Sequence, residues 1–262
     1  MKRSQKSNNL HAHAEIQTQI SNGLFLVVPV FLLFLYYDYG RYISRSCHLV
    51  WLLMVLVGLG SAYFHATLSL AGQLVDELAI LWVIAAATSL WIPKPLLPKR
   101  LVQHPNRFAI LVTIATVVAT LMGCVYPVIN NIVLMVFAFP TVFLVYSEAK
   151  SCNQQRASRL GLRSCVLWAV AVTFWISDRT MCQFWIGVGF PYLHSLWHII
   201  ITFGSYEAIT FMACIDTVHR YGHLEPRLVY WPSENVEIGI PYIAFRSKLP
   251  ITVENRIYNK IN

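Results

Sequence analysis

The chain has 262 residues, of which 56% are hydrophobic and only 12% are charged. Soluble domains carry about 25% charged residues, so this composition excludes an ordinary water-soluble globule and, equally, a disordered chain. The net charge of +8 would suit a nucleic-acid partner, but the charges lie in short gaps between apolar runs rather than on one basic face, so we expect no nucleic-acid binding.

Seven apolar runs follow one another along the chain, and most are long enough to cross a hydrocarbon core about 30 Å thick. Backbone groups in hydrocarbon must pair within their own segment, so each run predicts a helix. We therefore expect an all-α integral membrane protein, with a bundle of seven transmembrane helices in residues 20–216, a polar N-terminal tail (1–19) and a C-terminal tail (217–262). The fourth and fifth runs meet at Tyr126–Pro127, where the proline favours a break. The expected spans are 20–37, 48–69, 74–92, 108–126, 127–147, 162–178 and 193–216.

Basic residues occupy alternate gaps between these spans. The gaps after spans one, three and five and the C-terminal tail all contain Lys or Arg, whereas Arg179 is the only Lys or Arg in the gaps after spans two, four and six. By the positive-inside rule, the C-terminus is then cytosolic and the N-terminus lumenal. Lys2, Arg3 and Lys6 run against this orientation, and four agreeing segments outweigh them.

Polar and ionisable residues inside membrane spans are costly, so they indicate function. Ser61 and His65 lie four residues apart near the end of span two, and His194 and His198 have the same spacing at the start of span seven. Residues four apart share one helix face. Asp76 lies at the start of span three, and the predicted orientation brings all five residues to the lumenal side.

Each of these residues alone has a plainer explanation: an interfacial histidine, a serine bonded to its own helix, or an aspartate near a helix N-terminus. Together they favour a zinc site, because three imidazoles with an open fourth position are the ligand set of catalytic zinc. We predict that His65, His194 and His198 bind zinc, that Asp76 is the general acid/base, and that Ser61 stabilises an oxyanion. This chemistry indicates hydrolysis of an acyl bond in a substrate with long apolar chains, and leaves amide or ester open.

Two stretches carry a family resemblance: GLGSAYFHATLSLAGQLVDELAILW at 58–82 and WISDRTMCQFWIGVGFPYLHSLWHI at 175–199. They resemble the alkaline ceramidases, seven-span hydrolases of endoplasmic reticulum or Golgi membranes, and the similarity runs from about Ala14 to 242. The resemblance implies zinc at the three histidines, general acid/base catalysis by Asp76 and an oxyanion contact from Ser61. It also implies a ceramidase, an amidase that cleaves the linear C–N bond of ceramide to give sphingosine and a fatty acid.

The same superfamily includes adiponectin-type receptors, so a lipid-responsive receptor with weak or no hydrolase activity is the alternative function. Asp76 and Ser61 favour the enzyme, because a purely structural zinc ion needs neither residue.

The N-terminus departs from the family pattern. Members usually begin with an acidic Asp-Trp-Cys-Glu-x-Asn segment that helps to bind calcium, whereas this chain begins MKRSQKSNNLHAH. Glu15 is the sole carboxylate before the first span, and calcium prefers six to eight oxygen ligands. We therefore keep Glu15 only as a candidate residual calcium ligand and expect no calcium requirement. The family partner of Cys182 belongs to the same replaced segment, so Cys182 is expected to be a free thiol.

Overall fold

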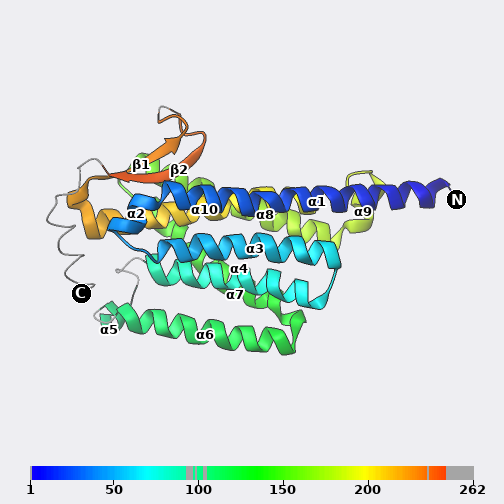
Figure 1. Ribbon diagram of the computed structural model, residues 1–262, viewed down its shortest axis with the longest axis horizontal. Coiled ribbons are helices and arrows are strands. Elements are labelled where there is room, and N and C mark those ends of the chain that lie inside the picture. The colour runs from blue at the N-terminus through cyan, green and yellow to red at the C-terminus, as the bar shows by residue number, and fades with distance from the viewer. Residues whose placement is uncertain (1, 93–96, 98, 103–104, 235, 246–262) are drawn as a thin grey trace.

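The computed structural model describes residues 2–92, 97, 99–102, 105–234 and 236–245, and for residues 2–16, 99, 102 and 105 it gives the backbone alone. Within these residues, seven helices are long and apolar enough to cross a membrane, as the composition predicts. They form an elongated bundle with a two-stranded sheet near one end (Figure 1). The long helices are α1 (Lys2–Leu35), α3 (Cys47–Thr67), α4 (Leu70–Trp91), α6 (Pro105–Val125), α7 (Asn130–Ser151), α8 (Gln155–Thr180) and α10 (Leu193–Tyr221). The short ones are α2 (Tyr37–Tyr42), α5 (Lys99–Val102), α9 (Cys182–Gly187) and the 3-10 turns η2 (Pro127–Ile129) and η3 (Gly222–Leu224).

Several helices extend beyond the predicted spans. α1 begins at Lys2, so most of the polar segment expected as a tail is helix that continues into the first span. α10 likewise continues to Tyr221, five residues past the expected boundary. Hydropathy detects only the part of a helix that suits hydrocarbon. Once that part has formed, each further residue adds a backbone hydrogen bond without a new nucleation step, so polar residues extend the helix.

The C-terminal segment contains an antiparallel hairpin that the sequence analysis did not predict. Its strands are β1 (Pro226–Trp231) and β2 (Ile240–Phe245). An isolated two-stranded hairpin is only marginally stable in water, so its sequence signal is weak. Here the hairpin packs on α10, and the ring of Trp231 contacts that of Phe31 on α1 at a centroid distance of 4.9 Å. These tertiary contacts stabilise the hairpin.

α10 lies at the centre of the bundle. It contacts α1, α4, α7, α8 and both strands, and two thirds of its most apolar stretch is buried inside the protein. α6, by contrast, packs mainly on α4 and leaves most of its side chains exposed on the outer face, as expected of a helix that faces lipid. Residues at the start of α10 are therefore surrounded by other helices on several sides.

The two ends of the bundle have different structures (Figure 1). At one, which we call the histidine end, α3 turns into α4 through Leu68, which has a left-handed conformation (φ 49°), and Ser69. The Ser69 hydroxyl caps α4 by accepting a hydrogen bond from the Gly72 N–H at 3.1 Å. The opposite end, the hairpin end, carries α2 and the hairpin, and an aromatic core that includes Tyr36 and Trp51 fills it. The site described below lies at the histidine end.

An ion pair between a partly exposed arginine and a buried glutamate joins α8 to α10. Arg163 contacts Glu207 through two nitrogen–oxygen pairs, at 2.9 Å (Nε to Oε2) and 2.8 Å (Nη2 to Oε1). Its third nitrogen donates to the main-chain carbonyl of Glu237 in the hairpin at 2.9 Å. Glu207 lies in an apolar run, and periodicity does not show that an arginine on a neighbouring helix faces it, so this pair could not be predicted from the sequence. The pairing makes two charges tolerable within a membrane span.

Candidate metal centre and active site

Close packing of α3 on α4 builds one wall of the site. A Cβ atom added at Gly72 would lie 2.8 Å from the Cα atom of Phe64, and one at Gly60 would lie 3.1 Å from the main-chain nitrogen of Asp76. Neither position has room for a side chain without a shift of the backbone. The two glycines therefore let the helices approach closely, and this approach brings Ser61 of α3 against Asp76 of α4.

Three histidines from two helices form a cluster. His65 comes from the last turn of α3, and His194 and His198 come from the first two turns of α10. One ring nitrogen from each lies within 4.8 Å of the others, and the ring centroids are 4.8 to 5.4 Å apart. The structure thus brings together the three histidines that the sequence analysis proposed as zinc ligands.

The hydrogen bonds of His198 fit a metal ligand. Ser21 on α1 donates its hydroxyl to the Thr18 carbonyl at 2.7 Å, and the same oxygen lies 2.9 Å from Nδ1 of His198. A hydroxyl has one hydrogen, so Nδ1 must donate to Ser21, and the lone pair of the neutral ring is then on Nε2. That Nε2 atom is buried and has no hydrogen-bond partner among the described residues. A buried lone pair beside two further imidazoles suits zinc.

A carboxylate lies beside His194, the second candidate ligand on the same helix. Oδ2 of Asp178, near the end of α8, is 3.5 Å from Nδ1 of His194. A carboxylate behind a metal-binding imidazole orients its ring and raises its basicity. Asp178 was not predicted from the sequence, where it reads as an ordinary polar residue at the end of a span.

One polar face of α1 supports the site, and the sequence analysis missed this role. Thr18 Oγ1 lies 3.0 Å from Oγ of Ser195, and Ser61 donates to Oδ1 of Asn22 at 3.1 Å. Thr18, Ser21 and Asn22 are all buried although they open an apolar span. Their spacing of three and four residues, which places polar groups on one helix face, was the signal that could have identified them.

The structure modifies what was expected of Asp76 and Ser61. α4 begins at Leu70, so Asp76 lies in its second turn rather than at its start. Ser61 is 2% exposed, and its hydroxyl contacts the carboxyl of Asp76 as well as Asn22. Because that hydroxyl has one hydrogen, it can donate to only one partner at a time. Any further acceptor would have to replace one of these partners.

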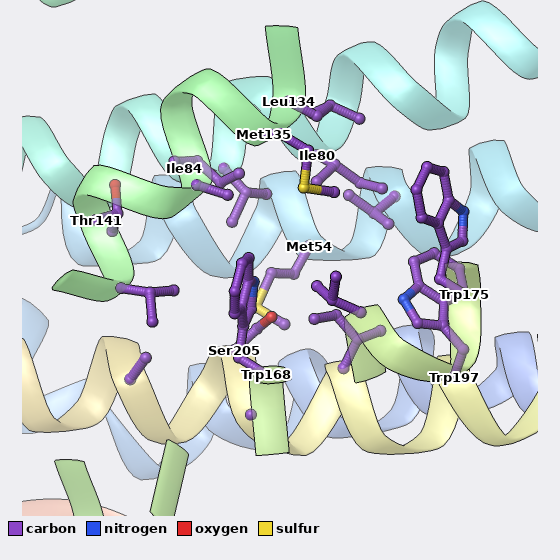
Figure 2. Close-up of a pocket in the computed structure, with 18 of the residues that line it drawn as sticks. Met54, Ile80, Ile84, Leu134, Met135, Thr141, Trp168, Trp175, Trp197 and Ser205 are labelled. Carbon is purple, nitrogen blue, oxygen red and sulfur yellow. The ribbon is translucent and has the colours of Figure 1, made fainter. Parts of the chain in front are cut away.

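An apolar cavity of about 220 Å³ leads away from the histidine cluster. Asp76 and His194 belong to its wall, whereas Ser61, His65 and His198 are not among the residues that line it. Figure 2 shows Trp175 and Trp197 at one end of the cavity and Thr141 at the other. The remaining lining is mostly aliphatic and aromatic side chains of α3, α4, α7, α8 and α10. The shape and lining suit a long apolar chain with a polar group at the histidine end.

Known proteins are similar in sequence to most of this chain. The family model described as Ceramidase matches residues 8–244. The chain belongs to the ceramidase family. It is 42% identical over 234 residues to the alkaline ceramidase of Drosophila melanogaster, covering 89% of this chain and 83% of the relative. It is 37% identical over 243 residues to alkaline ceramidase 1 of Mus musculus (92% and 89% covered) and 36% over 233 residues to alkaline ceramidase 1 of Homo sapiens (89% and 88%).

Two expectations followed from the altered N-terminal segment: that Glu15 is at most a residual calcium ligand, and that Cys182 is a free thiol. The side chain of Glu15, the candidate calcium ligand, lies outside the described residues. All six cysteines lie within them, and none forms a disulfide. Cys182, the expected free thiol, and Cys124 are both exposed.

Proposed function

We propose that this chain is an intramembrane zinc-dependent amidase that hydrolyses ceramide to sphingosine and a free fatty acid. The observation that carries the proposal is the position of the three-histidine cluster at one end of an apolar cavity whose wall includes Asp76. The apolar lining of the cavity suits a hydrocarbon chain of a ceramide, and the wall residues Asp76 and His194 lie at the end where the amide would be held. The relatives, which are named alkaline ceramidases, support the same substrate.

In this proposal, different residues bind the metal, transfer the proton and stabilise the oxyanion. His65, His194 and His198 hold zinc, which when bound supplies a Lewis acid that activates water and polarises a carbonyl. The Asp76 carboxylate accepts a proton as the water oxygen bonds to the amide carbon, and it returns the proton to the nitrogen as the C–N bond breaks. Ser61 turns its hydroxyl from Asn22 toward the oxyanion that develops on the carbonyl oxygen.

The alternative, a lipid-responsive receptor on the same scaffold, leaves Asp76 unexplained. A zinc ion with a purely structural role is closed by four ligands and needs no carboxyl group in the wall of a substrate-sized cavity. Asp76 is such a group, and close packing at Gly60 fixes its backbone. The hydrolase therefore accounts for more of the site.

We further propose that the histidine end faces the lumen of the endoplasmic reticulum or Golgi. The gaps between spans that reach this end contain Arg179 as their only Lys or Arg, whereas the gaps at the hairpin end are rich in both. The positive-inside rule then assigns the hairpin end to the cytosol.

One experiment separates enzyme from receptor. Purified protein in detergent is mixed with a fluorescent ceramide, with and without a zinc chelator, and His198→Ala is the matched inactive variant. We expect release of fatty acid by the wild-type protein, loss of release with chelator, recovery on adding zinc, and no release by His198→Ala. Zinc binding without any release of fatty acid would favour the receptor.

A further inference from the structure

Glu77 is a buried carboxylate that the proposed mechanism does not use. It lies in α4 directly after Asp76, it is only 9% exposed, and it lines the same cavity. Its Oε1 accepts a hydrogen bond from Nε2 of Gln73 at 2.9 Å, and its Oε2 accepts one from Nδ2 of Asn130 at 3.0 Å. Gln73 is one turn away on α4, and Asn130 is the first residue of α7, so a hydrogen-bonded network fixes the carboxylate at the contact between two helices.

Burying the Glu77 carboxylate within a membrane span costs free energy, and this cost suggests that Glu77 has a function. A carboxylate within a membrane span is expensive, and such residues mark functional sites more often than structural ones. The two donors to Glu77 are neutral amides, which stabilise a carboxylate less than a cation would. An apolar side chain in contact with α7 would pack the two helices at lower cost.

The hydrogen-bonding capacity of Glu77 is only half used. A carboxylate offers about four acceptor positions on its two oxygens. Gln73 and Asn130 fill one on each oxygen. The other positions can take donors from a molecule in the cavity, where the surrounding wall is mostly apolar and few other acceptors compete.

The location of Glu77 matches the chemistry of a ceramide. Consecutive residues of a helix point about 100° apart around its axis, so Asp76 and Glu77 present two carboxyl groups at one level to different parts of the cavity. In a long-chain base, the two hydroxyl groups are on the carbons next to the one that bears the amide nitrogen. A group that binds these hydroxyls must therefore lie beside the group that acts on the amide.

We infer that Glu77 is a specificity-determining residue that accepts hydrogen bonds from the hydroxyl groups of the long-chain base. This inference rests on the proposed function, because it assumes that the amide is cleaved at the histidine cluster. The enzyme would then select hydroxylated long-chain amides over amides of simple alkylamines, since an alkylamine leaves the carboxylate without its substrate donors.

The test compares two substrates that carry the same acyl chain: ceramide and an N-acyl alkylamine that lacks both hydroxyls. In the wild type, we expect kcat/KM to favour ceramide. Glu77→Gln keeps the side-chain shape and its bonds to Gln73 and Asn130, whose amides can turn. It should lower kcat/KM for ceramide about 10- to 100-fold and change that for the alkylamine much less. Thr141→Val, at the far end of the cavity, is the matched control and should affect both substrates equally.

The outcomes are separable from failure of the proposed function. A wild-type protein that cleaves both substrates equally well, or a Glu77→Gln variant with an unchanged ratio of the two kcat/KM values, would overturn the inference and leave the hydrolase intact. An equal fall for both substrates would also overturn it, because Glu77 would then act on Asp76 or on folding. If Glu77→Gln does not accumulate, Glu77→Asp, which retracts the carboxylate by one methylene, should also lower the ratio. A wild-type protein that cleaves neither substrate would remove the proposed function itself.

Discussion

Ser21 and His198 are joined across 177 residues of sequence by a hydrogen bond of 2.9 Å between Oγ and Nδ1. Since Ser21 donates its own hydrogen to the Thr18 carbonyl, its oxygen is free to accept, and the imidazole must present Nε2 to the histidine cluster. α1 thus sets the tautomer of a candidate metal ligand on α10.

Removing this hydroxyl should weaken zinc binding. Partners that orient a metal-binding histidine typically contribute about 10- to 100-fold to metal affinity. We expect a loss of this size in Ser21→Ala, measured by competition with a chromophoric zinc chelator in detergent. Ser21→Thr keeps the hydroxyl and should stay close to wild type. Equal zinc affinities in Ser21→Ala and wild type would show that the bond does not orient the ligand.

Asp76→Asn should retain zinc and lose turnover. An amide cannot accept the proton of the attacking water, so we expect a fall in kcat on the order of 100-fold or more, with zinc content unchanged. Ser61→Ala should cause a smaller but definite loss. Both are measured as ceramide turnover alongside the zinc content of the same preparation. If Asp76→Asn lost zinc in parallel with activity, Asp76 would be a ligand rather than the general acid/base.

The sequence predicts the seven helices and the histidine cluster for related physical reasons. Hydrocarbon excludes unpaired backbone, so long apolar runs have one available structure. Within such runs, His65, His194 and His198 are conspicuous because polar groups are rare there. The spacing of four places His194 and His198 on one face, and alternate basic gaps bring His65 to the same end. These predictions need no knowledge of which side chains are in contact.

The remaining parts of the site depend on which side chains meet, and spacing does not show that. Ser21 was visible as a polar residue in α1, but its partner His198 is 177 positions away. Asp178 and Glu77 resembled ordinary charged residues near helix ends. The hairpin was missed for the same reason: its stability comes from contacts with α1 and α10, which its own sequence does not encode locally.

Glu237 should anchor the hairpin to α8 in a pH-dependent manner. The guanidinium of Arg159, helped by Arg156, holds the pKa of the Glu237 carboxyl below its ordinary value of 4.5. A carboxyl whose pKa is lowered in the folded state adds stability above its unfolded pKa, and this stability is lost as the pH falls through the folded pKa. The wild-type protein should therefore lose part of its thermal stability below about pH 4.5 through this group.

The prediction is tested with Glu237→Gln. The Tm of this variant and of the wild type is measured in detergent from pH 7 to pH 3. Because the pair lies at the surface, we expect a loss of about 0 to 1 kcal/mol at pH 7 and a shallower decline of Tm in acid than in the wild type. Glu234→Gln, an exposed residue of the same loop, is the matched control and should follow the wild-type curve. Parallel Tm curves for Glu237→Gln and wild type would contradict the anchoring role.

The last prediction concerns calcium, for which this chain differs from the family pattern. Glu15 is the only carboxylate among residues 1–19, and Lys2, Arg3 and Lys6 add positive charge to the same segment. A calcium ion takes six to eight oxygen ligands and is repelled by nearby cations. We therefore expect neither Tm nor ceramide turnover to change when calcium is chelated in a buffer that holds free zinc constant.

Glu15→Gln tests the same prediction by removing the candidate ligand instead of the calcium. If Glu15 no longer binds calcium, the substitution should leave Tm and turnover unchanged both with and without micromolar calcium. Asp76→Asn, measured in parallel, shows whether the assay detects the loss of the proposed catalytic carboxylate. A rise in Tm or turnover on adding calcium to the wild type, absent in Glu15→Gln, would show that main-chain carbonyls complete a calcium site around this single carboxylate.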